Sequence, residues 1–153
     1  MIINTQKKIV TLSQMSNFNF DKKFNIFYKF RFHSDYLKIN TNKKKYSRIE
    51  SKIWFKKNIK FKKLFAIKID NKIIGLMIYN LDNYFYSIII LKKYRNHGNG
   101  TIALIKLIKF LKKNKLKLVT LIKKNNKNSV NLHKKNSKSY KSINKLFYYF
   151  III

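Results

Sequence analysis

Residues 94–100, with the sequence YRNHGNG, combine residue types that can bind a phosphate group. They include Gly98 and Gly100, two of the three glycines in the chain, and Arg95, one of its three arginines. A glycine turn that leads into a helix can direct successive backbone N–H groups into one concavity, where the helix dipole adds positive potential. A pyrophosphate group would fit such a turn. A plain strand-to-helix connection is the other interpretation, because the third glycine of the dinucleotide-binding fingerprint is absent.

The elements that position this turn follow from hydrophobic periodicity. They are a strand at 7–14, helices at 19–33 and from 47 onwards, strands at 64–69, 72–80 and 84–91, a helix at 99–113, a strand at 116–122, a helix at 126–136 and a final strand at 145–153. Asp70-Asn71 predicts a two-residue hairpin turn, so the three middle strands should form an antiparallel meander. The order indicates an α+β fold, a mixed sheet with helices on both faces, in a single domain of residues 1–153.

The charge of the chain is extreme, with 36 Lys and Arg residues against 5 Asp and Glu, a formal net charge of +31. Such a surface attracts polyanions. Almost all of the cations are lysines, however, whereas a dedicated nucleic-acid binder more often uses the bidentate arginine. The abundance of Lys, Asn, Ile, Phe and Tyr is typical of A/T-rich codon usage. We therefore do not expect nucleic acid as the main partner, although the charge would favour a phosphorylated cofactor.

Cysteine is absent, which excludes disulfides, thiolate metal sites and a covalent acyl-cysteine. Apolar runs such as residues 147–153 have the length of a strand and are too short to span a bilayer. No secretory signal pattern is present at the N-terminus. These features predict a cytoplasmic protein without a membrane partner.

The pattern R-x-x-G-x-G between a strand and a helix resembles the acetyl-CoA-binding motif of the GNAT N-acetyltransferase family. The resemblance implies a mostly antiparallel, twisted sheet with splayed middle strands, and acetyl-CoA as the co-substrate. In that family the loop holds the pyrophosphate and the preceding strand pairs with pantetheine. The residues implied here are Ile88, Ile89, Ile90, Leu91, Arg95, Asn96, His97, Gly98, Asn99, Gly100 and Thr101.

Residues 126–137 resemble a second block of the family, N-x-x-A/S-x-x-L-Y-x-K-x-G-F. Asn126, Ser129 and Lys135 match it and are expected beside the cofactor, while Ser137 and Lys138 replace the G-F pair. His133 stands where many relatives have a tyrosine that protonates the leaving thiolate. A histidine can do this only as an imidazolium. We therefore treat His133 as the candidate catalytic acid, with a plain surface histidine as the alternative.

Residues 31–55 resemble, less closely, a subgroup that acetylates amino groups of nucleotide-linked sugars, with the pattern S-x-x-E-H-x-x-W-F. The resemblance implies a small-molecule amine acceptor bound by Arg31, Glu50 and Trp54. Each has a structural alternative: an internal ion pair for Arg31, a helix-capping role for Glu50 and a core anchor for Trp54. Ser51 replaces the histidine of the subgroup, and Phe85 stands where relatives often have a glutamate base on the fourth strand.

Three functional hypotheses follow. The first is direct acetyl transfer from acetyl-CoA to the amine of a nucleotide-linked amino sugar, within a ternary complex. The second is the same chemistry on a protein N-terminus, as in ribosomal-protein acetyltransferases, which share parts of the pattern. The third is a basic nucleic-acid-binding protein that retains the fold without catalysis. A second copy of the chain, in a homodimer, is a further candidate partner.

Overall fold

The computed structural model describes residues 9–32 and 46–153 and contains two antiparallel sheets. The first has the strand order β1-β2-β3-β4, and the second has the order β5-β7-β6. The bounds are Val10–Gln14 for β1, Lys62–Ile69 for β2, Lys72–Asn80 for β3, Tyr86–Ile90 for β4, Val119–Lys123 for β5, Ser139–Ser142 for β6 and Phe147–Ile151 for β7. The α+β class is confirmed, and β6 is a strand that periodicity did not predict.

The two sheets diverge between β4 and β5. A single parallel bridge, Phe85 with Val119, links them in the described part of the chain. Next to it the Thr120 hydroxyl donates a hydrogen bond to the Tyr86 carbonyl oxygen at 3.2 Å. Beyond Tyr86 the two strands separate, which confirms the splayed middle strands. Splaying leaves the β5-facing edge of β4 without a neighbouring strand.

The hairpin between β2 and β3 is confirmed. Asp70 and Asn71 have φ angles of 48° and 62°, so both adopt the left-handed conformation that a type I′ turn requires. β1 pairs antiparallel with the other edge of β2, from Val10 opposite Ile69 to Gln14 opposite Phe65. The meander thus places β4 at the far edge of a four-stranded sheet.

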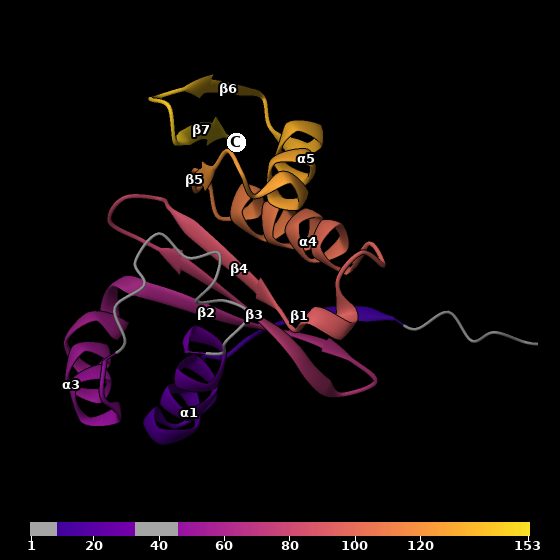
Figure 1. Ribbon diagram of the computed structural model, residues 1–153. Coiled ribbons are helices and arrows are strands. Elements are labelled where there is room, and N and C mark those ends of the chain that lie inside the picture. The colour runs from indigo at the N-terminus through magenta and orange to yellow at the C-terminus, as the bar shows by residue number, and fades with distance from the viewer. Residues whose placement is uncertain (1–8, 33–45) are drawn as a thin grey trace, which may run out of the picture.

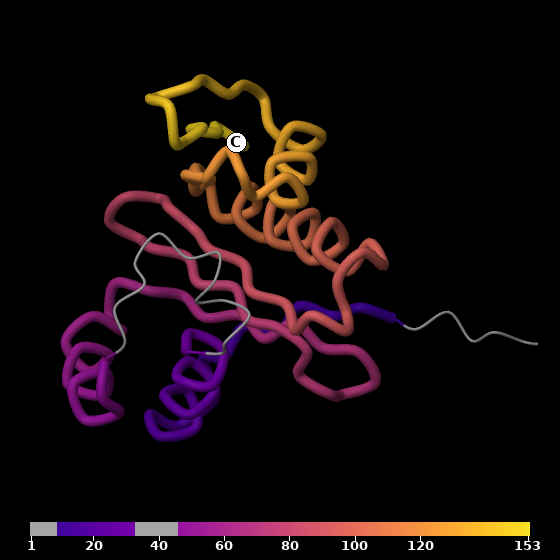
Figure 2. Tube along the Cα trace, viewed as in Figure 1, coloured from indigo at the N-terminus to yellow at the C-terminus, as the bar shows by residue number. Residues whose placement is uncertain are grey.

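Helices cover both faces of the first sheet (Figure 1). The helices are α1 at Phe20–Arg31, α3 at Arg48–Asn58, α4 at Asn99–Lys113 and α5 at Lys127–Asn136, with short 3₁₀ turns at Ile59–Phe61 and Lys92–Tyr94. α1 and α3 lie on one face and α4 lies on the other. Figure 2 shows α5 beside α4, next to the C-terminal strands. None of the helices in the described ranges is both long and apolar enough to cross a bilayer.

Each face of the first sheet has its own hydrophobic core. Under α1 and α3 the core is mainly aromatic, with Phe24, Phe27, Phe30 and Phe55 all nearly inaccessible to solvent. Under α4 the apolar stripe predicted from the sequence is buried, namely Ala103, Leu104, Leu107 and Leu111. The stripe fixes the rotation of α4 and, with it, the position of the loop that precedes the helix.

α3 buries a different face from the one that its aliphatic residues indicated. Ile49 is 75% exposed, Ile53 is 53% exposed and Trp54 is 46% exposed, whereas Ser51 and Phe55 are buried. The reason is that the Phe55 ring packs among the rings of α1 and lies 4.8 Å from the Phe27 centroid. The interpretation of Trp54 as a core anchor is therefore wrong, because Phe55 occupies the buried side of the helix.

Candidate active site

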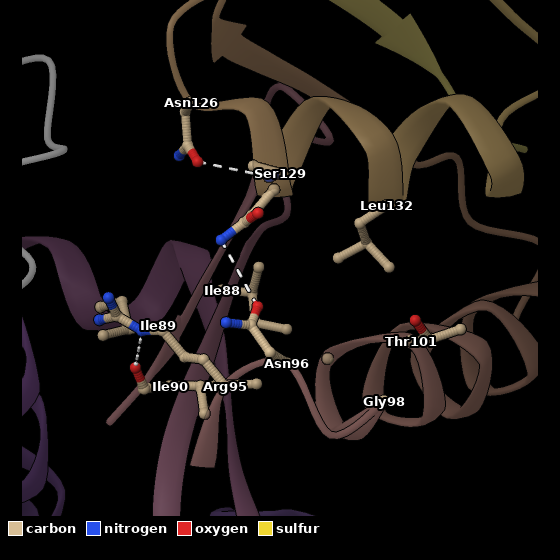
Figure 3. Close-up of a pocket in the computed structure, with 12 residues that line it drawn as sticks. Ile88, Ile89, Ile90, Arg95, Asn96, Gly98, Thr101, Asn126, Ser129 and Leu132 are labelled. Atoms are coloured by element: carbon tan, nitrogen blue, oxygen red, sulfur yellow. Dashed lines mark hydrogen bonds between the residues drawn. The ribbon is translucent and has the colours of Figure 1, made fainter. Parts of the chain in front are cut away.

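A cavity of about 300 Å³ lies between β4, the glycine loop, the first turn of α4 and α5 (Figure 3). Its walls come from segments that are distant in sequence but adjacent in the fold. The lining residues are Ile88, Ile89, Ile90, Arg95, Asn96, Gly98, Gly100, Thr101, Asn126, Asn128, Ser129 and Leu132. Ten of the fourteen residues predicted for cofactor binding thus line one cavity.

The edge of β4 supplies backbone hydrogen-bonding groups to this cavity. In the antiparallel ladder with β3, Phe85 and Leu91 direct their backbone groups toward β3, to Asn80 and Ile74. Backbone direction alternates along a strand. The peptide groups of Ile88 and Ile90 therefore point away from β3, toward the space that opens between β4 and β5. An extended amide chain can pair with such an edge.

The glycine loop presents backbone N–H groups to the same cavity. Gly98 has a φ of +75° and is the N-cap of α4, and no atom of the described residues lies within 4 Å of the position that a Cβ would take there. The first backbone bond of the helix runs from the N–H of Ile102 to the carbonyl of Gly98, at 3.0 Å. The N–H groups of residues 99–101 precede it and have no partner within the helix. Such amides, with the helix dipole, form an anion-binding site.

Two side chains hold the loop in place. The buried Asn99 amide donates to the Tyr94 carbonyl at 2.8 Å. Arg95 extends across the end of β4, where its Nε donates to the Ile90 carbonyl at 2.7 Å, as Figure 3 shows. Arg95 thus satisfies the last outward-facing carbonyl of the strand, and its remaining guanidinium donors lie at the cavity wall.

α5 forms the opposite wall of the cavity. Asn126 caps this helix, because its side-chain oxygen accepts a hydrogen bond from the Ser129 N–H at 3.3 Å. At the second residue of the helix, the Asn128 side-chain Nδ2 lies 3.5 Å from the Oδ1 of Asn96 in the loop. The polar first turn of α5 therefore faces the glycine loop across the cavity, and Leu132 adds an apolar surface one turn further on.

The location of His133 does not support its role as a catalytic acid. The side chain is 1% exposed, and burial lowers its pKa from 6.5 to about 4. Nδ1 lies 2.6 Å from the Ser129 carbonyl oxygen, so the ring proton is assigned to Nδ1 as the donor. Nε2 then accepts from the hydroxyl of the buried Tyr86. A neutral imidazole with both nitrogens engaged cannot supply the proton that an imidazolium would.

A second cavity, of about 330 Å³, lies between α1 and α3. All three residues predicted to bind the acceptor line it, namely Arg31, Glu50 and Trp54. The other lining residues are Phe27, Phe32, Tyr46 and Ser51. Glu50 also completes the predicted capping box, accepting from the Ser47 N–H at 2.8 Å. The capping role of Glu50 is thus confirmed. Glu50 also remains part of the cavity wall while it caps the helix.

Several predicted residues lie outside the two cavities. Leu91, His97, Asn99 and Lys135 do not line either of them. His97 and Lys135 are exposed, Leu91 packs against the core under α1, and Asn99 supports the loop as described above. Prediction from the sequence did not include Asn128 and Ser51 in either site. Asn128 was identifiable from its place two residues after the N-cap of α5, and Ser51 from its place at the position where the subgroup has a histidine. His33 lies outside the described residues.

The chain matches the model of the acetyltransferase (GNAT) family over residues 29–137, which is more than half of its length. The chain therefore belongs to the GNAT acetyltransferase family. Membership makes it an acetyl-CoA-dependent N-acetyltransferase and confirms the family predicted from the glycine loop. No curated protein matches the chain.

Solved structures with the same fold include the N-acetyltransferase PseH of Campylobacter jejuni in complex with acetyl coenzyme A. It has a TM-score of 0.66 and 21% sequence identity, covering 94% of this chain and 97% of that one. RimL, a ribosomal L7/L12 alpha-N-protein acetyltransferase in complex with coenzyme A, has a TM-score of 0.72 and 12% identity. The match covers 100% of this chain and 98% of RimL. A domain from Methanocaldococcus jannaschii has a TM-score of 0.74 and 15% identity, covering 95% and 99%. At these identities the likeness shows the fold.

Proposed function

We propose that this chain transfers the acetyl group of acetyl-CoA to a primary amine of a nucleotide-linked amino sugar. One observation supports this class of acceptor: Arg31, Glu50 and Trp54 line the same cavity between α1 and α3. All three belong to residues 31–55, the segment that resembles nucleotide-sugar acetyltransferases. The fold that the chain shares with PseH is compatible with this acceptor but does not specify it.

The lining of the cavity between β4, α4 and α5 supports the binding of acetyl-CoA there. The N–H groups of residues 99–101 and the positive end of α4 would hold the pyrophosphate. Among residues 9–32 and 46–153 no atom lies within 4 Å of a Cβ at Gly98, which leaves room for a phosphate to approach the backbone. The outward-facing peptide groups of Ile88 and Ile90 would pair with the pantetheine amides. Once bound, acetyl-CoA supplies an electrophilic thioester carbonyl.

The chain contributes binding and orientation to the reaction. The chain has no cysteine to carry an acyl group, so the acceptor nitrogen attacks the thioester carbonyl directly in a ternary complex. A C–N bond forms, the C–S bond breaks, the amine loses one proton and the thiolate gains one. Holding both substrates in one orientation makes the largest contribution that this arrangement can offer, because it converts an encounter of two molecules into a unimolecular step.

A screen of aminated nucleotide sugars with acetyl-CoA tests the proposal, with free thiol as the readout. We expect turnover with at least one of them and initial velocities that give intersecting lines in double-reciprocal plots. Peptides with a free N-terminal residue form the comparison arm. Turnover of peptides without turnover of any aminated nucleotide sugar would refute the acceptor class and leave the family chemistry intact.

A further inference from the structure

The cavity between α1 and α3 contains a polar group that the fold itself leaves unsatisfied. Ser51 is 5% exposed, and its Oγ has no hydrogen-bond partner in the described part of the chain. Buried hydroxyls are normally hydrogen-bonded, because leaving one unpaired is unfavourable. Ser51 lines the cavity, and its Oγ is itself covered by protein atoms in the free protein. The hydroxyl is therefore an unpaired donor and acceptor beside the cavity, and a rotation of the Ser51 side chain would bring it to a bound ligand.

Aromatic rings form much of the wall of this cavity. Trp54 stacks on Phe27 with ring centroids 5.9 Å apart and an interplanar angle of 17°. Tyr46 and Phe32 line the same cavity. Half-exposed tryptophan and tyrosine side chains are suited to contact a flat, partly polar ring, because each combines a large apolar face with a polar atom. The shape and chemistry of the walls favour a heteroaromatic base over a flexible aliphatic chain.

Lys62 places a cation against the Trp54 ring, although it lies outside the lining of this cavity and lines a different one. Its Nζ lies 5.4 Å from the centroid of the Trp54 ring and also bonds to the Asn80 side chain. Burial lowers the pKa of Lys62, and Arg31 lowers it further, against the opposing effect of Asp82. The positive charge of Arg31 thus acts on Lys62. Two like charges held together in a partly buried place are stabilised when an anion binds between them.

We infer that Ser51 and Lys62 are specificity residues for a nucleoside diphosphate group. Ser51 pairs with the polar edge of the base, the ring lies against Trp54, and Lys62 acts with Arg31 on the phosphates. This rests on the proposed function for the identity of the whole acceptor, of which the nucleoside diphosphate is one part. Binding of that part does not depend on acetyl transfer, so it is measurable alone.

Trp54 is the single tryptophan of the chain, so its fluorescence reports on this cavity without added labels. Uridine diphosphate is titrated into the full-length protein at about 0.15 M salt, where non-specific charge attraction is screened beyond roughly 8 Å. We expect a saturable change in Trp54 emission with uridine diphosphate, and the same change in the presence of saturating coenzyme A. Uridine should bind at least about tenfold more weakly, because it lacks the phosphates.

Two variants and one control test the residues. Lys62→Gln should raise the dissociation constant for uridine diphosphate by about tenfold and that for uridine by less than about twofold. Lys109→Gln removes the same charge from an exposed position of α4, on the opposite face of the sheet, and should leave both constants unchanged. Ser51→Ala should weaken both ligands by a similar factor, while its melting temperature stays equal or rises. A falling melting temperature would show that the hydroxyl stabilises the free fold.

The outcomes separate this inference from the proposed function. If the wild-type protein acetylates an aminated nucleotide sugar but Lys62→Gln and Ser51→Ala leave its KM unchanged, the inference is wrong and the function stands. If uridine diphosphate binds in a manner that depends on Lys62 and Ser51 while no aminated nucleotide sugar is acetylated, the function is wrong and the binding site stands. An unchanged Trp54 emission up to millimolar uridine diphosphate overturns the inference.

Discussion

Gly100→Ala should raise the stability of the chain and lower its affinity for acetyl-CoA. Gly100 lies in the first turn of α4, at the cavity wall. A Cβ at this position would lie 3.6 Å from the Cδ1 of Ile90, 3.7 Å from the Cδ2 of Leu132 and 4.0 Å from the Cδ1 of Ile88. These are ordinary van der Waals distances, so the methyl group fits without displacing the helix. All three neighbours line the cavity, which means that the methyl group projects into it.

The two effects have different magnitudes and opposite signs. Alanine is favoured over glycine within a helix by about 0.5–1 kcal/mol, which corresponds to a melting temperature higher by roughly 1–4 °C for a chain of this size. The same methyl group would narrow the approach of a pyrophosphate to the N–H groups of the first turn. We expect the dissociation constant for acetyl-CoA to rise about tenfold, or about 1.4 kcal/mol.

Calorimetric titration with acetyl-CoA and a thermal melt measure both quantities on the same preparation. Ile105→Ala serves as the control, because Ile105 is 40% exposed on α4 and does not line the cavity. The control should leave acetyl-CoA affinity unchanged. If Gly100→Ala melts at a higher temperature yet binds acetyl-CoA as tightly as the wild type, the pyrophosphate does not occupy this loop.

Three further predictions concern the elements around the site. Gly75→Ala should cost about 1–3 kcal/mol in urea unfolding, because its Cβ would lie 2.5 Å from the Ile89 carbonyl oxygen and displace β4. The folded-state pKa of His133, about 4, is below its unfolded value of 6.5, so the unfolded chain binds this proton first. Stability from this residue should therefore be lost as pH falls from about 6.5 to about 4, by up to about 3 kcal/mol, and His133→Phe should reduce that dependence in urea unfolding at a series of pH values. Asn126→Ala removes the cap of α5 and should cost about 1 kcal/mol in the same unfolding assay.

Local signals in the sequence predicted the parts of the fold that neighbouring residues determine. The Asp70-Asn71 turn, the Ser47 capping box and the apolar stripe of α4 all depend on interactions within a few residues. The glycine loop was predictable for the same reason, since its function depends on backbone conformation at Gly98. Because α4 follows the loop directly, predicting the helix also placed its N-terminus at the proposed cofactor site.

Features that depend on distant contacts were not predictable. β6 has the sequence SYKS and is exposed throughout, so it carries no hydrophobic pattern, and its pairing with β7 alone makes it a strand. Gly75 is required because β4 passes close to it, which only the sheet register reveals. The outward orientation of Trp54 follows from the packing of Phe55 against α1. The split into two sheets likewise depends on where β4 and β5 separate.

The neutral state of His133 and the absence of a carboxylate at position 85 are consistent with a single mechanism. At pH 7, protonating a histidine whose pKa is about 4 costs about 4 kcal/mol, so an imidazolium donor would be rare. Tyr86 cannot replace it, because its hydroxyl donates to His133 Nε2 and burial raises its pKa well above 10. In the proposed reaction the attacking amine loses one proton and the departing thiolate gains one. Passing that proton from nitrogen to sulfur, directly or through water, requires neither a general base nor a general acid. Both departures from the family pattern therefore follow if the chain acts mainly by positioning its two substrates.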